Sequence, residues 1–386
     1  MKQNRTCEIC GNETELSVIK EIKYKLPSSY KIPSWYEIVS CKKCGFCYAN
    51  VLASISDYDH YYKNYNYYSQ EVLSNVPANL SKNEVMDLFC RMCRTEDKIL
   101  DIGFGKGELL LTLRSHGFLN LFGLDPSGES VGSIKEHGIR AQVGNIYQMD
   151  HFTGGKMDVV VIAGVLEHLL EPSLALENIT KVLAIGGKLI VTVPNCLNLK
   201  KDISPVCSHF NQEHINYFSV VSLKNMMARY GFLEELVIAE EKYTDILAVF
   251  RYHGEHASRG YEKDEQTSIA IGVYLESNGR REELYNRKLE KYVREQLPVA
   301  VWGTGAFAMS LLSNTDLGDC NIHCFIDNNE MKCSSDFLGK AVILPQYIAN
   351  HIQIQAIVIA SIRSAAAIKE QLLNLGWDRD IIVLSE

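Results

Sequence analysis

The sequence predicts an α/β protein whose central part is a doubly wound sheet, and three observations lead to that prediction. Predicted strands and helices alternate from Ile99 to Val193, which is typical of parallel strands with helices on both faces. Paired cysteines before this region indicate a small metal-binding module, and a second strand–glycine–helix pattern starts at Val299. A length of 386 residues also favours two or three domains over one. The expected divisions are a metal-binding module with a tyrosine-rich linker or lid at 1–75, the main α/β domain at 76–252, a helical connector at 253–296 and a smaller α/β domain at 297–386.

Composition and charge exclude several classes of function. The net charge of -8, from 39 Lys and Arg against 47 Asp and Glu, does not suggest a nucleic-acid surface. No run of 18 apolar residues predicts a membrane span, and the first residues lack the apolar core of a signal peptide. A cytoplasmic protein is therefore expected. In that compartment the 12 cysteines are interpreted as thiols and metal ligands rather than disulfides.

A glycine turn follows the first strand of the main domain. Ile99–Ile102 is predicted as a short buried strand, and the turn after it has the spacing Asp-x-Gly-x-Gly-x-Gly, from Asp101 to Gly107. Backbone without side chains can lie against a nucleotide-like ligand at such a turn. The turn lacks the Gly-Lys-Ser/Thr triplet of a phosphate-binding loop, and an acid at this position suits an ammonium group better than a phosphate. A nucleotide-type fold with another ligand, or with none, is the alternative interpretation.

Two Cys-x-x-Cys-Gly sequences define the N-terminal module. The two-residue gap lets both sulfurs of a pair face one metal ion, and the glycine permits the turn that points amides at the thiolates. Two such pairs predict a closed four-thiolate zinc site with a structural role. A redox dithiol would explain one pair but not two. The expected ligands are Cys7, Cys10, Cys41 and Cys44, with Cys47 as a competing ligand or, preferably, a buried thiol.

The main domain resembles the class I S-adenosylmethionine-dependent methyltransferases. The glycine turn matches their first motif, and three later features follow in register: a strand ending at Asp125, the sequence Gly144-Asn145-Ile146, and the strand Met157–Ala163 followed by Gly-Val-Leu-Glu-His-Leu. The resemblance implies a seven-stranded doubly wound sheet in which Asp125 binds the ribose hydroxyls and Asn145-Ile146 holds the adenine. His168 is interpreted as structural or adjacent to the cofactor. The residues implied at the S-adenosylmethionine site are Asp101, Gly103, Phe104, Gly105, Gly107, Asp125, Pro126, Asn145, Ile146, Ala163 and His168.

A polar segment before the predicted helix at Val220 is expected to hold the chemistry, because ligands lie outside the carboxyl ends of strands in such sheets. It contains Glu213, His214 and Tyr217. Methyl transfer needs a nucleophile that has lost its proton, and a neutral imidazole is matched to that task near neutral pH. His214 is the preferred base. Glu213 either takes the proton instead or orients the imidazole.

The C-terminal unit starts with a strand, the sequence Gly303-Thr-Gly305-Ala-Phe-Ala, and a helix, which fits a dinucleotide fingerprint. Asp327 follows at the end of another predicted strand, where a ribose-binding acid would lie. The direct interpretation is a nicotinamide cofactor site. The unit is short, however, and a second set of catalytic residues is not evident. A smaller Rossmann-like domain that helps to hold the substrate is therefore preferred.

Taken together, the chain resembles the zinc-containing deoxysugar C-methyltransferases, which act on nucleotide-linked 4-keto sugars in antibiotic and surface-polysaccharide pathways. The cysteine pairs, the glycine turn, the Glu213-His214 pair and the C-terminal Gly-Thr-Gly carry this resemblance. It implies that Glu213-His214 removes a proton beside a ketone, and that a tyrosine after the zinc module approaches the substrate. The expected candidates for that tyrosine are Tyr65, Tyr67 and Tyr68.

Three alternatives stay open at this point. His214 followed by Tyr-Phe-Ser also occurs in methyltransferases that modify oxygen, so O-methylation of a sugar is the close alternative. A bifunctional protein with a nicotinamide-dependent reductase in its C-terminal half is another, and a non-catalytic scaffold is the third. The predicted partner is a nucleotide-sugar substrate, and the oligomeric state is open.

Overall fold

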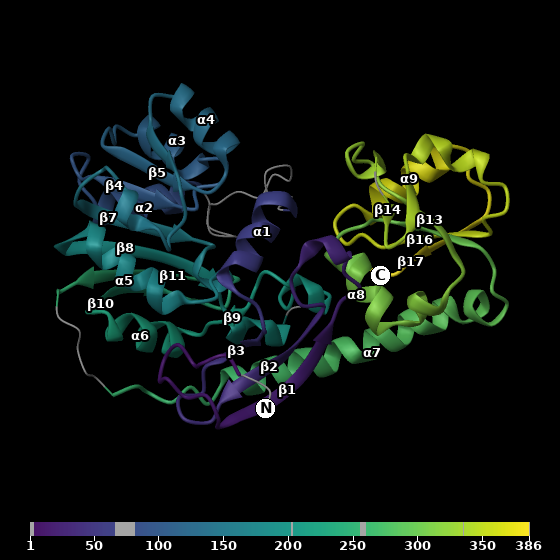
Figure 1. Ribbon diagram of the computed structural model, residues 1–386, viewed down its shortest axis with the longest axis horizontal. Coiled ribbons are helices and arrows are strands. Elements are labelled where there is room, and N and C mark those ends of the chain that lie inside the picture. The colour runs from purple at the N-terminus through teal and green to yellow at the C-terminus, as the bar shows by residue number, and fades with distance from the viewer. Residues whose placement is uncertain (1–3, 66–81, 202–203, 255–259, 335, 386) are drawn as a thin grey trace. The chain divides into compact units, whose positions relative to one another are not determined.

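The computed structural model describes residues 4–65, 82–201, 204–254, 260–334 and 336–385 (Figure 1). These residues form two compact units. The first contains residues 1–20, 37–201 and 213–271, and the second contains residues 21–36, 202–212 and 272–386. Each unit has a sheet of its own, and each is described separately below.

A seven-stranded sheet is the centre of the first unit. Its order is β10-β11-β8-β7-β4-β5-β6. The five strands from β6 to β8 are parallel, whereas β11 is antiparallel to both of its neighbours, β8 and β10. This arrangement confirms the predicted seven-stranded sheet, including the inserted antiparallel strand of the class I methyltransferases. The strands are β4 (Ile99–Ile102), β5 (Leu121–Asp125), β6 (Arg140–Val143), β7 (Met157–Ala163), β8 (Leu183–Pro194), β10 (Phe232–Ile238) and β11 (Asp245–Tyr252).

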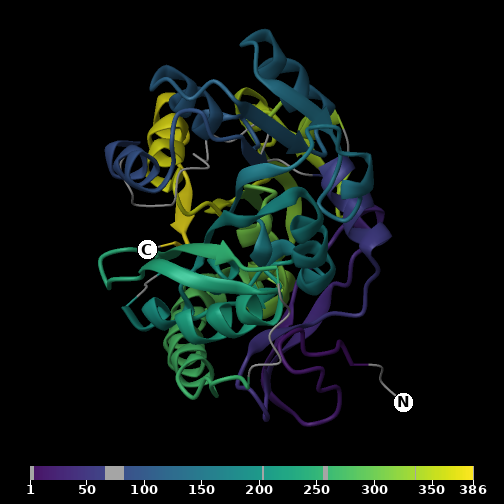
Figure 2. The ribbon, with the colours of Figure 1, turned by 90° about the vertical axis from the view of Figure 1, so that its left-hand side faces the viewer.

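Helices cover both faces of this sheet (Figures 1 and 2). The strands between the two edge strands, β6 and β10, are mostly buried, and alternate side chains enter two different hydrophobic cores. Ile99 packs in one core, for example, and Leu100 packs in the other. The first core includes α2 (Lys82–Met92), α3 (Glu108–Ser115) and α4 (Gly128–Glu136), and the second includes α5 (Pro172–Val182) and α6 (Val220–Arg229).

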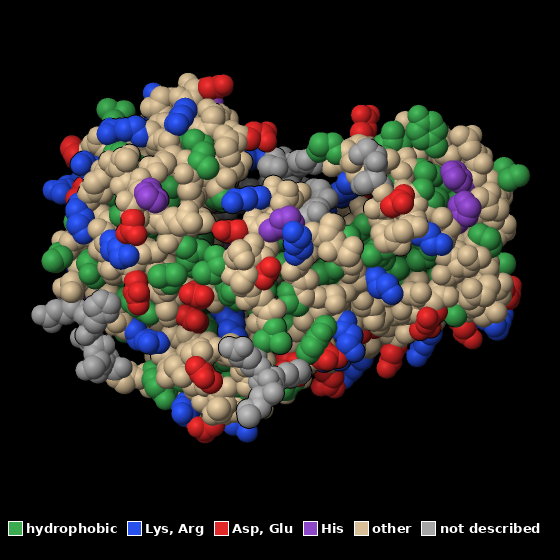
Figure 3. Space-filling view, viewed as in Figure 1, with side chains coloured by type: hydrophobic (Ala, Val, Ile, Leu, Met, Phe, Trp, Pro, Cys, Tyr) green, Lys and Arg blue, Asp and Glu red, His purple; other side chains and the backbone are tan. Residues whose placement is uncertain are grey.

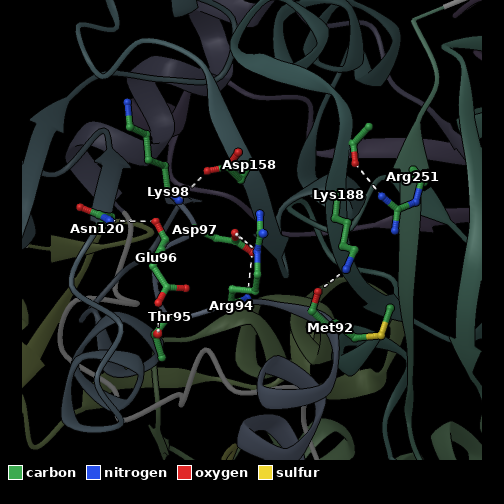
Figure 4. A network of polar contacts seen from close by, with 11 residues as sticks. Met92, Arg94, Thr95, Glu96, Asp97, Lys98, Asn120, Asp158, Lys188 and Arg251 are labelled. Carbon is green, nitrogen blue, oxygen red and sulfur yellow. Dashed lines mark hydrogen bonds and ion pairs between the residues drawn. The ribbon is translucent and has the colours of Figure 1, made fainter.

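A polar network joins the loops at the amino ends of the parallel strands (Figure 4). The backbone amide of Lys98 donates to the Asp158 carboxylate at 2.9 Å, and the Asn120 side chain donates to the carbonyl of Glu96 at 2.8 Å. Lys188 on β8 donates to the carbonyl of Met92 at the end of α2. These contacts satisfy backbone groups at the edge of the sheet opposite to the glycine turn.

The cysteine module contributes to a second, four-stranded sheet with the order β1-β2-β3-β9. Its strands are β1 (Leu16–Lys23), β2 (Trp35–Cys41), β3 (Cys47–Asn50) and β9 (Asn216–Tyr217), and the helix α1 (Ile55–Tyr65) follows β3. Strand β9 belongs to the segment that was predicted to be catalytic. It pairs with β3 so that Cys47 is opposite Tyr217 and Tyr48 is opposite Asn216. The cysteine module and the candidate catalytic segment are therefore joined by a backbone ladder.

The second unit contains a six-stranded sheet with the order β14-β15-β13-β12-β16-β17. All its pairs are parallel except the β14–β15 hairpin, which makes it a smaller Rossmann-like sheet as predicted. Its strands are β12 (Val299–Trp302), β13 (Ile322–Ile326), β14 (Asp336–Phe337), β15 (Lys340–Ile343), β16 (Ala356–Ile359) and β17 (Asp380–Val383). The remaining α-helices are α7 (Thr267–Arg294), α8 (Ala306–Asn314) and α9 (Ala365–Asn374). Short 3-10 turns occupy Ser28–Tyr30, Met149–His151, Leu166–His168, Cys196–Lys201, Val206–Ser208, Asp316–Asp319, Lys332–Ser334 and Pro345–Asn350.

Two surface properties follow from the described residues. None of their helices is both long enough and apolar enough to cross a membrane. On the face shown in Figure 3, positive and negative side chains are interspersed and no large basic patch is visible.

Candidate functional site

The glycine turn after β4 has a backbone that only glycine adopts easily. Gly103, Gly105 and Gly107 have φ angles of 73°, 54° and 74°. Space is also limiting, because a Cβ on Gly103 would lie 2.8 Å from Val165 and one on Gly107 would lie 2.4 Å from Ile134. The Gly103 amide donates to the carbonyl of Leu124 at 2.7 Å. The turn is therefore fixed by sterics and hydrogen bonds, and it presents bare backbone at the carboxyl ends of β4 and β5.

Two acids flank this turn. Asp125 ends β5, and its carboxylate accepts from the amides of Gly105 at 2.9 Å and Ser127 at 2.8 Å. Asp101 on β4 is buried, and its Oδ2 atom has no hydrogen-bond partner among the described residues. Burial, with a smaller contribution from Asp125, raises the pKa of Asp101 to about 7. A buried carboxylate without a partner beside a backbone cradle fits the ammonium group of S-adenosylmethionine.

The other residues of the predicted cofactor site occupy the ends of the neighbouring strands. Asn145 follows β6 and accepts through its side chain from the amide of Tyr147 at 3.0 Å. Ala163 ends β7, and Pro126 is exposed directly after β5. Two members of the set, Phe104 and Ile146, have side chains buried in the two cores, so only their backbone is available to a ligand.

Four polar side chains meet near the carboxyl end of β7. Glu167 and His168 lie in the 3-10 turn that follows β7, and Glu213 and His214 precede β9. The rings of His168 and His214 are edge to face with centroids 4.7 Å apart. His168 Nδ1 lies 3.1 Å from the carbonyl oxygen of Glu213. Burial lowers the pKa of His168 to about 4, so this imidazole is neutral at pH 7.

Helix α1 of the cysteine module reaches the same cluster. The Tyr61 hydroxyl donates a 2.8 Å hydrogen bond to Oε1 of Glu213, and the Tyr62 hydroxyl lies 3.4 Å from Nδ1 of His168. Tyr61 is buried. A side chain from the tyrosine-rich segment thus holds one of the two candidate bases in a fixed orientation. Tyr217, the third predicted catalytic residue, lies in β9 and is buried.

The segment around the candidate bases is held by one arginine and one asparagine. The buried Arg5 guanidinium donates to the carbonyls of Ala49, Leu169, Leu170 and Ile215 and, at 2.8 Å, to the side chain of Asn216. The Asn216 amide in turn donates to the carbonyls of Leu166, Glu167 and Leu169. These bonds connect the start of the cysteine module to both loops of the cluster.

The four predicted zinc ligands come together. Their sulfur atoms all lie within 4.8 Å of one another, with 3.4 Å between Cys7 and Cys44 and between Cys10 and Cys41. Tetrahedral zinc with bonds of about 2.3 Å needs sulfurs about 3.8 Å apart, so the cluster fits the ion. The glycine after each pair, Gly11 and Gly45, has a positive φ and donates its amide to the first cysteine carbonyl of that pair.

The fifth cysteine of this module lies outside the cluster. Cys47 is buried in β3, and its sulfur is 3.5 Å from the carbonyl oxygen of Gly45. Burial raises the pKa of this thiol. A protonated thiol of this kind packs as a small apolar group.

In the second unit, Asp327 follows β13 near the turn of Gly303 and Gly305. Its Oδ2 atom accepts from the Thr304 hydroxyl at 2.7 Å and from Lys332 at 3.0 Å. Its Oδ1 atom accepts from the amide of Asn329 at 3.0 Å. Both carboxylate oxygens therefore accept hydrogen bonds within the unit.

Residues 60–233 match the family model described as a methyltransferase domain. The matched region includes the glycine turn, both acids and the cluster of Glu167, His168, Glu213 and His214. This part of the chain matches a methyltransferase domain. Residues 295–383 match a second model, described as C2185-like, N-terminal. No curated protein matches the chain.

Solved structures with a similar arrangement cover about half of the chain. An S-adenosylmethionine-dependent methyltransferase from Mesorhizobium loti is 14% identical, over 44% of this chain and 98% of its own, with a TM-score of 0.37. The 1,6-didemethyltoxoflavin-N1-methyltransferase of Burkholderia thailandensis, bound to its substrate and S-adenosylhomocysteine, is 15% identical over 54% and 95%, with a TM-score of 0.40. A methyltransferase from Clostridium acetobutylicum is 13% identical over 50% and 99%, with a TM-score of 0.39.

Several residues at the candidate site of the methyltransferase domain were not singled out from the sequence. Arg5, Glu167 and Asn216 act through contacts between distant segments, which no local pattern reveals. Tyr61 belongs to the tyrosine-rich segment, but the expected candidates were Tyr65, Tyr67 and Tyr68. Residues 67 and 68 and the side chain of residue 65 lie outside the described part of the chain, so those candidates stay predictions. The density of tyrosine marked the segment but did not single out Tyr61 within it.

Proposed function

We propose that the protein transfers a methyl group from S-adenosylmethionine to a carbon of a nucleotide-linked keto or deoxy sugar, in surface-polysaccharide or secondary-metabolite biosynthesis. The hydrogen bond from Tyr61 to Glu213 is the observation that carries this proposal. It fixes a carboxylate next to the His214 imidazole, near the carboxyl end of β7. A fixed carboxylate and a neighbouring imidazole are what the removal of a proton from carbon requires.

The proposed reaction has two steps. The base, His214 or Glu213, takes the proton from the carbon beside the ketone, and the electron pair of that C–H bond forms an enolate. The enolate carbon then attacks the methyl group in line with the carbon–sulfur bond. That bond breaks, its electron pair stays on sulfur, and S-adenosylhomocysteine leaves as a neutral thioether. The glycine turn and Asp101 would hold the amino-acid part of the cofactor, so that the methyl group is presented to the enolate.

We also propose that zinc occupies the cluster of Cys7, Cys10, Cys41 and Cys44. With four thiolates around it, the ion has no open position for water or substrate, so its role is structural. It would replace a hydrophobic core that this small module is too short to build. Because β9 pairs with β3 of the same module, a stable zinc site supports the segment that bears Glu213 and His214.

The C-terminal unit is proposed to bind a nucleotide rather than a redox cofactor. The short length of this unit, at 297–386, supports this proposal over a redox site. Nicotinamide cofactors provide the test, because any ligand of the folded state raises its melting temperature. A clear rise with added NAD or NADH, lost in Asp327→Asn, would instead favour the bifunctional alternative.

The experiment that tests the main proposal is a mass-spectrometric methyl-transfer assay in heavy water. Purified protein and S-adenosylmethionine are offered a panel of 4-keto nucleotide sugars and their fully reduced counterparts. Carbon methylation predicts a methylated keto sugar and, in controls without S-adenosylmethionine, exchange of the hydrogen beside the ketone. Methylation of reduced sugars alone would move the acceptor from carbon to oxygen. No exchange and no C-methyl product with any keto sugar would refute the proposal.

A further inference from the structure

Glu167 and His168, in the turn after β7, form a group of metal-ligand side chains with His214, and the proposed reaction assigns no role to the first two. One oxygen of Glu167 and one ring nitrogen each of His168 and His214 all lie within 4.8 Å of one another. This is the second such group among the described residues, and it is separate from the four cysteines. We propose that Glu167, His168 and His214 bind a divalent transition-metal ion beside the candidate base.

The protonation of His168 is the first argument. Its Nδ1 atom lies 3.1 Å from the carbonyl oxygen of Glu213, and a carbonyl can only accept a hydrogen bond. Nδ1 therefore carries the ring proton, and Nε2 presents a lone pair. A histidine that donates Nδ1–H to a backbone carbonyl while Nε2 points to the metal is a common arrangement around bound ions.

The position of Glu167 is the second argument. Its Oε1 atom faces Nε2 of His168 at 3.8 Å, which exceeds the 2.7–3.2 Å of a direct hydrogen bond. Its Oε2 atom is buried and has no hydrogen-bond partner among the described residues. A buried carboxylate oxygen without a partner thus lies beside the His168 ring, and a cation bound there would satisfy it.

Geometry and ligand type decide the class of ion. With bonds of about 2.1 Å, ligand atoms around one tetrahedral ion are separated by about 3.4 Å, so atoms at the 4.8 Å limit would close by up to about 1.4 Å. Two imidazoles and one carboxylate suit Zn²⁺, Fe²⁺, Co²⁺ or Ni²⁺, whereas Mg²⁺ and Ca²⁺ prefer oxygen ligands alone. Three protein ligands leave a coordination position open, as in catalytic rather than structural sites.

The role of this ion rests on the proposed function, although its binding does not. A cation at this position would accept the ketone oxygen of the substrate and stabilise the negative charge of the enolate. Glu213, held by Tyr61, would then be the base, because His214 would coordinate the ion through one ring nitrogen. The C–H proton passes to Glu213 and the charge that forms on oxygen is balanced by the ion.

The test is a titration of the zinc-loaded protein with Co²⁺, followed by visible absorption and by metal analysis after desalting. Nitrogen and oxygen ligands give Co²⁺ bands without the intense thiolate charge-transfer absorption that cobalt in the cysteine cluster would show. We expect the wild type to bind one Co²⁺ per chain without thiolate absorption and to retain its zinc. Glu167→Gln and His214→Gln should bind it at least about tenfold more weakly, whereas the exposed His116→Gln should match the wild type.

The outcomes separate this inference from the proposed function. A wild type that takes up no cobalt beyond the cysteine cluster, or variants that bind it as the wild type does, would overturn the metal site. Binding of S-adenosylmethionine by each variant shows that its methyltransferase domain is folded. If cobalt binds as expected but no keto sugar is methylated, the metal site stands and the substrate proposal fails.

Discussion

Arg5 donates a 2.8 Å hydrogen bond to the side chain of Asn216, which joins a residue just before Cys7 to one just after His214. The same guanidinium binds four backbone carbonyls, and two of them, Leu169 and Leu170, follow the turn of Glu167 and His168. The two loops that carry the candidate catalytic side chains are thus held by one buried side chain from the cysteine module.

Replacement of Arg5 should therefore lower both stability and activity. Arg5→Ala leaves five buried acceptors without their donor, and we expect a loss of about 3–5 kcal/mol in the free energy of unfolding. Because Asn216 and the carbonyls would reorient, kcat should fall by about tenfold or more even well below the melting temperature. Chemical unfolding and methyl-transfer kinetics at low temperature measure the two effects.

Arg229→Ala is a matched control for this variant. Arg229 also donates to the cysteine module, at the carbonyls of Glu8 and Ile9, but it does not contact either catalytic loop. It should lower stability while leaving kcat near the wild-type value. Equal losses of kcat in the two variants would show that Arg5 acts through the stability of the module and not through the position of the loops.

Loss of one zinc ligand is expected to release the metal and unfold the cysteine module. Cys41→Ser should lower the zinc content by one ion per chain and expose β3, so that β9 loses its pairing partner. Zinc analysis and limited proteolysis measure these changes. Cys90→Ser is the control, because Cys90 is exposed and lies outside the cluster. A Cys41→Ser protein with unchanged zinc would mean that the four sulfurs do not share one ion.

Local patterns predicted the glycine turn, both acids beside it and the four cysteines, because spacing along the chain alone fixes those sites. The seven-stranded sheet also followed, from the resemblance to the class I methyltransferases. Contacts such as those of Arg5 with Leu170 and Asn216 could not be predicted in this way. They join segments that are far apart in sequence, and no periodicity in either segment encodes its partner.

The pKa of Asp101 gives the protein a specific dependence of stability on pH. Burial raises this pKa from 3.8 to about 7, so the folded chain keeps a proton that the unfolded chain releases above pH 4. The stability that this group contributes is therefore complete at low pH and falls as pH rises from about 4 to about 7. The free energy of unfolding of Asp101→Asn should therefore rise relative to that of the wild type by about 2–3 kcal/mol as pH increases from 5 to 8.

Urea unfolding of the cofactor-free chain at several pH values measures this difference. Subtraction of the wild-type curve removes the contributions of other buried acids, including Asp125 and Glu167, whose pKa values are also raised by burial. The exposed Asp150→Asn should run parallel to the wild type at all pH values. Parallel curves for Asp101→Asn and the wild type would instead mean that Asp101 is ionised in the folded chain.

The hydrogen bond between Tyr61 and Glu213 can be tested by removal of one hydroxyl. Tyr61→Phe keeps the ring in place but leaves the Glu213 carboxylate free to rotate, so kcat should fall by about tenfold with little change in KM. Glu213→Gln removes the base itself if Glu213 takes the proton, and the expected loss is then about 10²–10⁴-fold. Steady-state kinetics together with exchange of the substrate hydrogen in heavy water measure both variants.

The ratio of these two losses identifies the base. If His214 takes the proton and Glu213 only orients it, Glu213→Gln and Tyr61→Phe should have similar, modest effects, and His214→Gln should abolish the exchange. If Glu213 is the base, its replacement alone should abolish exchange, while Tyr61→Phe slows exchange and methyl transfer by the same factor. Tyr252→Phe is the control for the loss of a tyrosine hydroxyl. Tyr252 ends β11 beside the start of β8, at the amino ends of the parallel strands, so this variant should retain wild-type kcat.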